Sequence, residues 1–321
     1  MRVALVGVTG AAGYIGGDLI PAIARSGHSI RAVDNFTGLA NAVRPEWTVQ
    51  RGDLRDPSVL HRLTDCDVVL HLAAVSGVMA CAADPVGAAS VNVAATRSLL
   101  ELCRERAIPL AFASSFAVVG IPERLPITED TPPRPTHEYA RQKAQGEAIV
   151  REASGKGTVP FAILRMSNVY GQYSIGERVI SKGNVLTVFS NQAKTGRLTV
   201  NAPGTQRRDF VHIEDVVSHW AAVVGFLVKP RHGGACSVFN VASGESETIR
   251  EVAERFASQW ARRFPSRAPP TIEVVPNPRG AIELLQPEFA IDRRRTEDAL
   301  GVRCRWNLDT GIDALLAAGA G

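Results

Sequence analysis

The chain has 321 residues, of which 45% are hydrophobic and 21% charged, and its formal net charge is +4. These proportions are typical of a globular enzyme, and the chain contains no internal repeat and no low-complexity segment. A small charge carried by scattered basic residues does not form the basic patch that nucleic acid requires, so we expect no nucleic-acid partner.

Membrane and metal signals are also missing from the sequence. No run approaches the roughly 18 consecutive apolar residues of a membrane-spanning helix, and Met1 leads directly into an expected strand without a signal peptide. We therefore expect no membrane partner and a cytoplasmic location. The cysteines are odd in number and lack CxxC or other metal-type spacing, which predicts reduced packing residues and no metal site.

Apolar runs alternate with helical patterns in the first half of the chain. The expected strands are Val3 to Val8, Ser29 to Val33, Thr48 to Arg51, Val68 to Leu72, Leu110 to Ala113 and Phe161 to Arg165. The expected helices are Tyr14 to Ser26, Pro57 to Leu63, Val86 to Arg106 and Glu138 to Ala153. This alternation predicts an α/β fold, a doubly wound parallel sheet of Rossmann type with helices on both faces.

The pattern becomes irregular after Tyr170. Prolines and glycines are spread through residues 171–203 and 265–287, and insertions of this length are usually functional. We expect residues 1–170 to form the nucleotide-binding domain and residues 171–321 a smaller, interleaved α/β substrate domain. Asp209 to Ile213 and Val238 to Val241 are strand-like, so segments near 209–242 are expected to return to the sheet domain.

The stretch from Thr9 to Gly16 lies between the first expected strand and the first expected helix. Its glycines have the spacing of a dinucleotide-binding turn. Gly10 allows a tight turn, Gly13 lets the backbone approach a pyrophosphate, and Gly16 lets the helix pack closely on the strand. The phosphates are then expected at the N–H groups of that helix. An ordinary glycine-rich turn is the alternative.

Three further strand ends fit a nucleotide site. Asp34 follows the glycines by about 20 residues, where a carboxylate accepts both ribose hydroxyls and repels a 2′-phosphate, which favours NAD over NADP. Alternatively, Asp34 only opens the turn after it. Gly52-Asp53-Leu54 follows the third strand near the expected adenine, and His71-Leu72-Ala73-Ala74 ends the fourth near phosphate and ribose. Ordinary buried strand ends explain these last two equally well.

Catalytic candidates follow the fifth strand. Ser114 and Ser115 come directly after it, at the carboxyl edge where ligands bind in this architecture. Tyr139 and Lys143 are one helical turn apart on one face of a helix. A free tyrosine titrates near pH 10, but an adjacent ammonium and a nicotinamide cation favour phenolate. Tyr139 can then remove a hydroxyl proton as hydride leaves the same carbon, assisted by Ser115. A surface helix pair is the alternative.

An ordered set of motifs runs along nearly the whole chain: TGAAGYIG, Asp34-Asn35, GDL, HLAA, SVNVAAT, SSFAVVG, YARQK, LRMSNVYG, RDFVH and FNVASGE. With this set the chain resembles the extended short-chain dehydrogenases/reductases of the NAD-dependent epimerase/dehydratase family. Among them it is most similar to UDP-glucose 4-epimerases. The resemblance implies bound NAD, a nucleotide-diphosphate sugar as substrate, and a homodimer built on the helices Val86 to Arg106 and Glu138 to Ala153.

The resemblance also implies site residues. Contacts to NAD are implied for Gly10, Gly13, Tyr14, Ile15, Gly16, Asp34, Asn35, Asp53, Leu54, Leu72, Ala73, Ala74, Asn92, Tyr139, Lys143 and Met166. Contacts to the substrate are implied for Ser115, Asn168, Asn184, Val185, Leu198, Val200, Arg208 and Arg279. A guanidinium can bind two diphosphate oxygens at once. For Arg208, an ion pair with Asp209 or another neighbour is the alternative.

The chain departs from the family pattern beside the catalytic serine. Dehydratases and uronic-acid decarboxylases of the family usually carry an acid two places after it, but Ser115 is followed by Phe116 and Ala117. Val119 replaces the usual tyrosine before Gly120, and Met166-Ser167 replaces the usual aromatic pair before Asn168. These changes alter the pocket beside the sugar, so the family pattern does not identify the sugar.

We therefore expect a nucleotide-sugar 4-epimerase that acts on a UDP-hexose or UDP-hexuronic acid through transient oxidation at C4 by tightly bound NAD. The first alternative is an NAD-dependent sugar or alcohol dehydrogenase, or a keto-sugar reductase. The second is a family member that uses NAD only as a sensor or scaffold and binds a protein partner.

Overall fold

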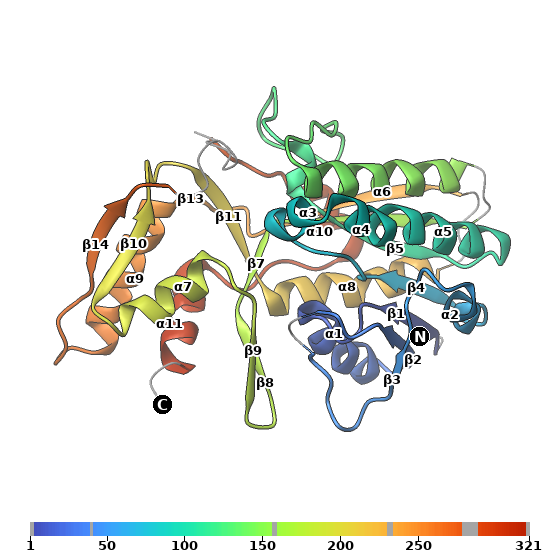
Figure 1. Ribbon diagram of the computed structural model, residues 1–321, viewed down its shortest axis with the longest axis horizontal. Helices are drawn as coiled ribbons and strands as arrows, with labels where there is room; N and C mark the ends of the chain where they lie inside the picture. Colours follow the sequence, from blue (N-terminus) through green and yellow to red (C-terminus); the bar gives the residue numbers. More distant parts are fainter. Residues whose placement is uncertain (1–2, 39–40, 156–158, 230–233, 278–287, 319–321) are drawn as a thin grey trace.

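The computed structural model describes residues 3–38, 41–155, 159–229, 234–277 and 288–318. At its centre is a seven-stranded parallel sheet in the order β12, β6, β5, β4, β1, β2, β3 (Figure 1). Its strands are β1 Leu5–Thr9, β2 Ser29–Asp34, β3 Val49–Arg51, β4 Val68–His71, β5 Leu110–Ser115, β6 Phe161–Met166 and β12 Cys236–Val241. The expected doubly wound parallel sheet is confirmed.

Helices cover both faces of this sheet. The α-helices within the described residues are α1 Tyr14–Arg25, α2 Pro57–Leu60, α3 Val78–Ala83, α4 Pro85–Ala89, α5 Thr96–Glu105, α6 Glu138–Gly155, α7 Val185–Ala193, α8 Ile213–Leu227, α9 Ile249–Arg263, α10 Arg294–Leu300 and α11 Leu308–Ala318. On one face α1 and α8 bury Leu19 and Trp220, and on the other α5 and α6 bury Leu99 and Val150. Figure 1 shows the two helix layers above and below the sheet.

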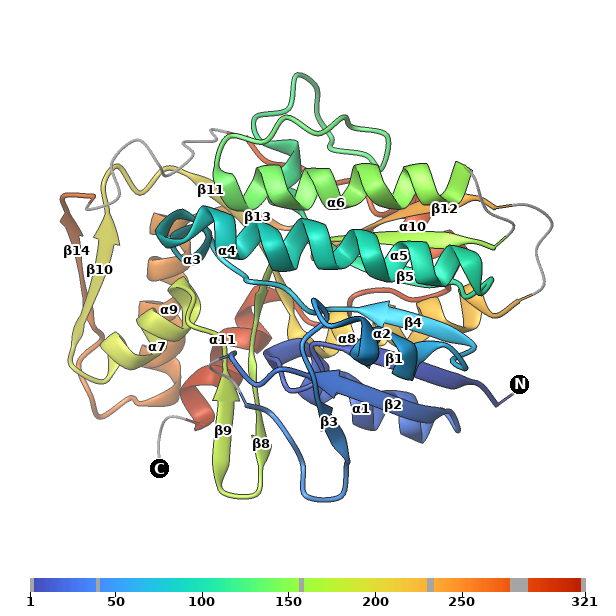
Figure 2. The ribbon, with the colours of Figure 1, turned by 45° about the vertical axis from the view of Figure 1, so that its right-hand side comes forward.

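A second hydrophobic cluster forms beside the sheet. It contains α7, α9 and α11 together with the parallel pair β10 (Arg197–Asn201) and β14 (Thr271–Val275). Phe189 and Phe256 meet edge to face at its centre, with ring centroids 5.8 Å apart. In both ribbon views this cluster lies at the end of the molecule beyond β7 (Asn168–Tyr170) (Figure 2).

The strand expected at Asp209 to Ile213 is present as β11 (Arg207–His212), but it does not join the large sheet. It pairs in parallel with β7 and antiparallel with β13 (Ser246–Thr248). β11 starts with two half-buried arginines, so its first half suits a small, solvent-edged sheet better than a buried layer. The following α8 and β12 do return to the large sheet.

The expected helix Val86 to Arg106 is interrupted. α4 is followed by a π-helix, Ser90–Ala95, and only then by α5. The hydrophobic spacing gives no sign of this wider turn, which contains Asn92 and its contacts described below. π-turns within helices are common at functional sites.

The five cysteines are all free thiols, and burial raises the pKa of Cys66 to about 12 and that of Cys236 to about 11. Within the described ranges of the chain, no helix combines the length and the apolar character needed to cross a bilayer.

Candidate active site

The glycine-rich turn between β1 and α1 is tightly constrained. Gly10 has φ of +69°, and a Cβ there would lie 2.6 Å from the amide nitrogen of Ala73. A Cβ on Gly16 would lie 2.4 Å from the carbonyl oxygen of Gly10. Gly13 precedes α1, and this end of the helix has neither a side-chain cap nor an acidic residue in its first turn. The open amides and positive end of α1 therefore suit an anion.

Asp34 stabilises this turn through hydrogen bonds to backbone amides. One carboxylate oxygen accepts the amide of Ala12 at 2.9 Å, and the other accepts the amide of Phe36 at 2.6 Å. Asp34 therefore opens the following turn and also fastens the glycine turn. A carboxylate fixed at the tip of β2 retains lone pairs for ribose hydroxyls.

Asn35, Asp53 and Leu54 meet beside Asp34. The Asn35 amide lies 3.4 Å from the Asp53 carboxylate, which also pairs with Arg55 at 2.7 Å. The Arg55 guanidinium holds the pKa of Asp53 well below its usual range, so this carboxylate is charged. Leu54 is buried in the core beneath it.

The end of β4 packs against the glycine turn. The amide of Leu72 donates to the Thr9 carbonyl at 3.1 Å, and the amide of Ala73 lies 3.3 Å from the Thr9 hydroxyl. Leu72, Ala73 and Ala74 are half-buried, so their backbone borders the turn. Below them His71 is fully buried, with Nδ1 2.7 Å from the Thr9 hydroxyl, and burial lowers the pKa of His71 to about 3.

Asn92 fastens the loop after β4 to α6. Its side-chain oxygen accepts the Val75 amide at 2.8 Å, and its nitrogen donates to the Val75 carbonyl at 3.0 Å and to Gln142 at 2.8 Å. The buried Asn92 amide is thus used within the protein. Gln142, which lies between Tyr139 and Lys143 in the sequence, was not singled out from the sequence.

The structure brings the three catalytic candidates together at the carboxyl edge of β5. Lys143 is buried, donates to the Ala113 carbonyl at 2.8 Å and lies 5.0 Å from the Phe112 ring. Burial lowers the pKa of Lys143 to about 8. Burial also raises the pKa of Tyr139, and hydrogen bonding by the hydroxyls of Ser76 and Ser115 partly offsets this.

Ser76 is a site residue that sequence reasoning missed. It lies in the loop after β4, and its hydroxyl hydrogen-bonds to Tyr139. Its signal was its position just beyond HLAA, because every loop that leaves the carboxyl edge of a parallel sheet borders the ligand region.

Tyr14 and Ile15 begin α1, and Tyr14 also meets the hairpin of β8 (Gln172–Ile175) and β9 (Arg178–Ser181). The Tyr14 hydroxyl donates to the Gly171 carbonyl at 2.9 Å, and the Tyr173 hydroxyl donates to the Tyr14 carbonyl at 2.7 Å.

Ile15 packs against the core on the α8 side. The sulfur of Met166 lies 3.4 Å from the indole nitrogen of Trp220, so this side chain points into the same core.

Two of the substrate candidates, Asn168 and Asn184, lie around β7. Asn168 donates to the Asp209 carbonyl at 2.9 Å. Asn184 caps α7, whose first residue is Val185, and donates to the Val169 carbonyl at 2.9 Å.

The remaining substrate candidates differ in accessibility. Arg208 is half-buried on β11 and donates to the Arg207 carbonyl at 2.7 Å. Asp209 is bound instead by Ser167, Ser243 and the Gly244 amide. The side chains of Leu198 and Val200 are fully buried, so only the backbone of β10 can face a ligand there. Arg279 lies outside the described residues.

Comparisons with known proteins agree with this architecture. The UDP-glucose 4-epimerase of Streptococcus mutans is 30% identical over 277 residues, covering 81% of this chain and 82% of that protein. The Thermus thermophilus UDP-glucose 4-epimerase complex with NAD has a TM-score of 0.79 at 28% identity and covers 99% of both chains. MoeE5 in complex with UDP-glucuronic acid and NAD has a TM-score of 0.78 at 26% identity, covering 97% of both.

The family model described as "NAD dependent epimerase/dehydratase family" matches residues 6–242, from β1 to the end of β12. This range includes the glycine turn, the edge of β5 and the helix that carries Tyr139 and Lys143. The chain belongs to the NAD-dependent epimerase/dehydratase family.

Proposed function

We propose that this protein is a UDP-sugar 4-epimerase that keeps NAD bound throughout its reaction. The observation that carries the proposal is the convergence of Ser115, Tyr139 and Lys143 at the edge of β5, beside a glycine turn built for a dinucleotide. The similar proteins named above include UDP-glucose 4-epimerases and a complex with UDP-glucuronic acid. A UDP-hexose or UDP-hexuronic acid is therefore the proposed substrate.

The residues present fit NAD. At Gly10 and Gly16 a Cβ would collide with backbone, so the turn keeps the close approach that a pyrophosphate needs. Asp34 offers a carboxylate to the adenosine ribose. When bound, NAD supplies an oxidised nicotinamide that takes hydride from the sugar C4 and returns it.

The protein's own side chains transfer the proton of the sugar 4-hydroxyl. Tyr139 removes the proton of the 4-hydroxyl and later gives it back, while Ser115 hydrogen-bonds the same oxygen. Burial by itself works against this role, because it raises the pKa of Tyr139 and lowers that of Lys143. Hydrogen bonds from the hydroxyls of Ser76 and Ser115 favour the phenolate instead. An ammonium at Lys143, one helical turn away, is proposed to act in the same direction.

We propose that the two parts of the chain bind different molecules. Residues 1–170 hold the cofactor, and residues 171–321 hold the nucleotide diphosphate through Arg208 and Asn184, together with Asn168 from the end of the first part. Ser115 is followed by Phe116 and Ala117, and neither side chain can transfer a proton, which argues against elimination or decarboxylation. If the diphosphate is bound firmly beside an apolar sugar pocket, the 4-keto sugar can rotate and present its other face before hydride returns.

We also propose a homodimer formed by α5 and α6 with their counterparts. The supporting observation is apolar exposure next to α6, since Met79 on α3 is 61% exposed and Val86 on α4 is 82% exposed. Light scattering during gel filtration measures the mass, and Val86→Glu should shift a dimer towards monomer.

The experiment that tests the function is proton NMR of the purified protein with UDP-, GDP- and dTDP-hexoses and hexuronic acids, without added cofactor. Catalytic conversion of one sugar to its 4-epimer supports the proposal and identifies the substrate. If product forms only with added NAD or NADH, one equivalent per turnover, the protein is a dehydrogenase or reductase and the proposal is wrong. Tyr139→Phe serves as the inactive control.

A further inference from the structure

A buried carboxylate lies directly behind the catalytic candidates. Glu147 is on α6 one turn after Lys143, and its side chain is 1% exposed. Oε1 accepts the hydroxyl of Ser114 at 2.6 Å and Nε of Arg165 at 2.9 Å, and Oε2 accepts the second arginine nitrogen at 2.8 Å. One side chain thus joins α6 to both β5 and β6.

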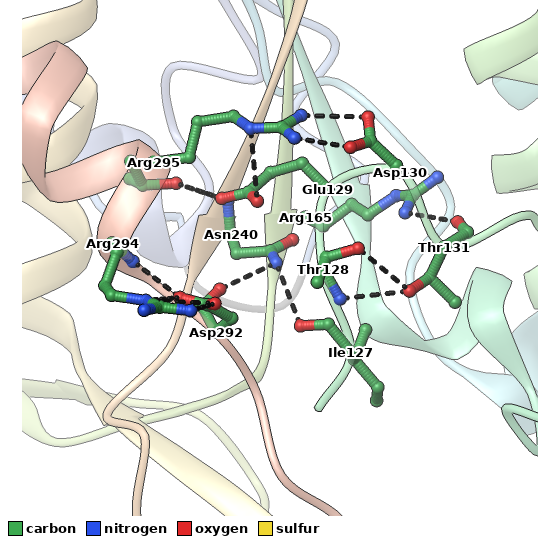
Figure 3. A network of polar contacts seen from close by, with 11 residues as sticks. Ile127, Thr128, Glu129, Asp130, Thr131, Arg165, Asn240, Asp292, Arg294 and Arg295 are labelled. Atoms are coloured by element: carbon green, nitrogen blue, oxygen red, sulfur yellow. Dashed lines mark hydrogen bonds and ion pairs between the residues drawn. The ribbon is translucent and has the colours of Figure 1, made fainter. Parts of the chain in front are cut away.

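Arg165 is anchored in turn. Its third nitrogen donates to the Thr131 carbonyl at 2.9 Å (Figure 3). Together with the two bonds to Glu147, this uses all three guanidinium nitrogens. The loop that carries Thr131 is held from its other side by α10, where Arg295 pairs with Asp130 and the Thr296 hydroxyl donates to Glu129 at 3.0 Å. Arg165 is therefore fixed between a helix, a strand and a braced loop.

The geometry of α6 on β5 depends on this anchor. Ser114 stands between Ala113, whose carbonyl accepts from Lys143, and Ser115, which faces Tyr139. Gly146 lets the helix approach closely, because a Cβ there would lie 2.4 Å from the Phe112 ring. A shift of α6 along the strand would separate Tyr139 from Ser115 and Lys143 from Ala113 together.

We propose that the buried pair of Glu147 and Arg165 is a positioning unit for the reaction, which locks α6 onto β5 and β6 and sets the charge of Glu147 behind Lys143. The inference rests on the proposed function for its kinetic consequences. A buried ion pair is weak evidence for stability, since well-packed apolar residues often replace one without loss. Here its contacts converge on the strand and helix that carry the catalytic groups.

The charges around Lys143 define what the carboxylate does. Cys81 from α3, His71 from β4, Lys182 from the segment before α7 and Glu147 on the same helix interact electrostatically with the ammonium. Cys81 and His71 are neutral near pH 7, because burial raises the pKa of the thiol and lowers that of the imidazole. Among these groups Glu147 is the one negative charge that supports the ammonium at that pH.

The first test replaces Glu147 with glutamine and measures kcat, KM and the titration of Lys143. The chain has five lysines, so carbon-13 lysine NMR resolves them, and Lys143→Arg assigns the signal. We expect kcat to fall roughly tenfold or more with KM little changed. We expect the Lys143 midpoint, about 8 in the wild type, to move down. Glu152→Gln, an exposed change of the same kind on α6, should leave both unchanged.

The second test separates positioning from stability. Glu147→Gln leaves Arg165 buried without its partner and can fail to fold. The double variant Glu147→Gln with Arg165→Gln removes both charges. It replaces them with two amides that can hydrogen-bond to each other. We expect it to fold, with kcat still reduced. If it regains wild-type kcat, the pair is only structural and the inference is overturned.

Failure of the proposed function is distinguishable from failure of this inference. If the wild type converts no UDP-sugar, the expected change in kcat cannot be tested. The titration midpoint of Lys143 still reports on the effect of Glu147. An unchanged midpoint in both Glu147 variants overturns the inference whatever the reaction is.

Discussion

Acidification should destabilise this protein through His71. Its Nε2 lies 2.9 Å from the Thr96 hydroxyl, which donates to the Asn92 carbonyl and therefore accepts from the ring. Nδ1 is then free to accept from Thr9. The pKa of His71 falls from 6.5 to about 3, so between these values the unfolded state binds the extra proton and stability is lost as pH falls. At pH 5 the loss is about 2 kcal/mol, from ~1.5 pH units at ~1.4 kcal/mol each.

The assay is urea unfolding of the wild type and His71→Gln at pH 7.5 and pH 5. The other histidines are shared by both proteins, so the difference between the two pH dependences belongs to His71. We expect the wild type to lose about 2 kcal/mol more than the variant between these pH values. An equal loss in both proteins would refute the reasoning, because it would mean that the native state takes up the proton at His71 without cost.

Three further changes test the site. Tyr139→Phe should abolish turnover but leave NAD bound, because it removes the proton-transfer group and not the phosphate site; retained activity contradicts the mechanism. Asp34→Ala should weaken NAD roughly tenfold and narrow its advantage over NADP, measured by calorimetry on nucleotide-free protein; an unchanged preference makes Asp34 a turn residue only. Tyr173→Phe should cost about 1 kcal/mol and speed NAD loss on dialysis, whereas wild-type retention would show that its bond to Tyr14 is unimportant.

The sequence was sufficient for the large sheet because its signals are local. Apolar runs that alternate with helical spacing predicted six of the strands to within a few residues, including Leu110 to Ala113, which continues to Ser115 in the structure. The site followed from the same logic, since Ser115 and Tyr139 each stand at a position that the architecture places at one edge. A spacing of four residues on one helix needs no tertiary knowledge.

The remaining features depend on partners distant in sequence. β11 reads as a strand, but its pairing with β7 depends on residues about 40 positions earlier. The π-turn at Ser90–Ala95 accompanies the contacts of Asn92 with Val75 and Gln142, which no periodicity encodes. No sequence pattern distinguishes Glu147 from a helix surface residue, because its partner Arg165 lies on a different element, β6.

The β8–β9 hairpin bears on the choice between epimerase and dehydrogenase. It holds both ends of Tyr14, at the start of the helix expected to receive the pyrophosphate, and Arg178 adds a bond to the Asn41 carbonyl at 3.3 Å. Ile175 and Ile180 pack with Ala42 in a small apolar cluster at the same place. A dehydrogenase must release its cofactor at every turnover, whereas an epimerase returns it unchanged. Because the hairpin bridges the glycine-turn helix and the loop after β2, it would oppose repeated release, and this favours the epimerase.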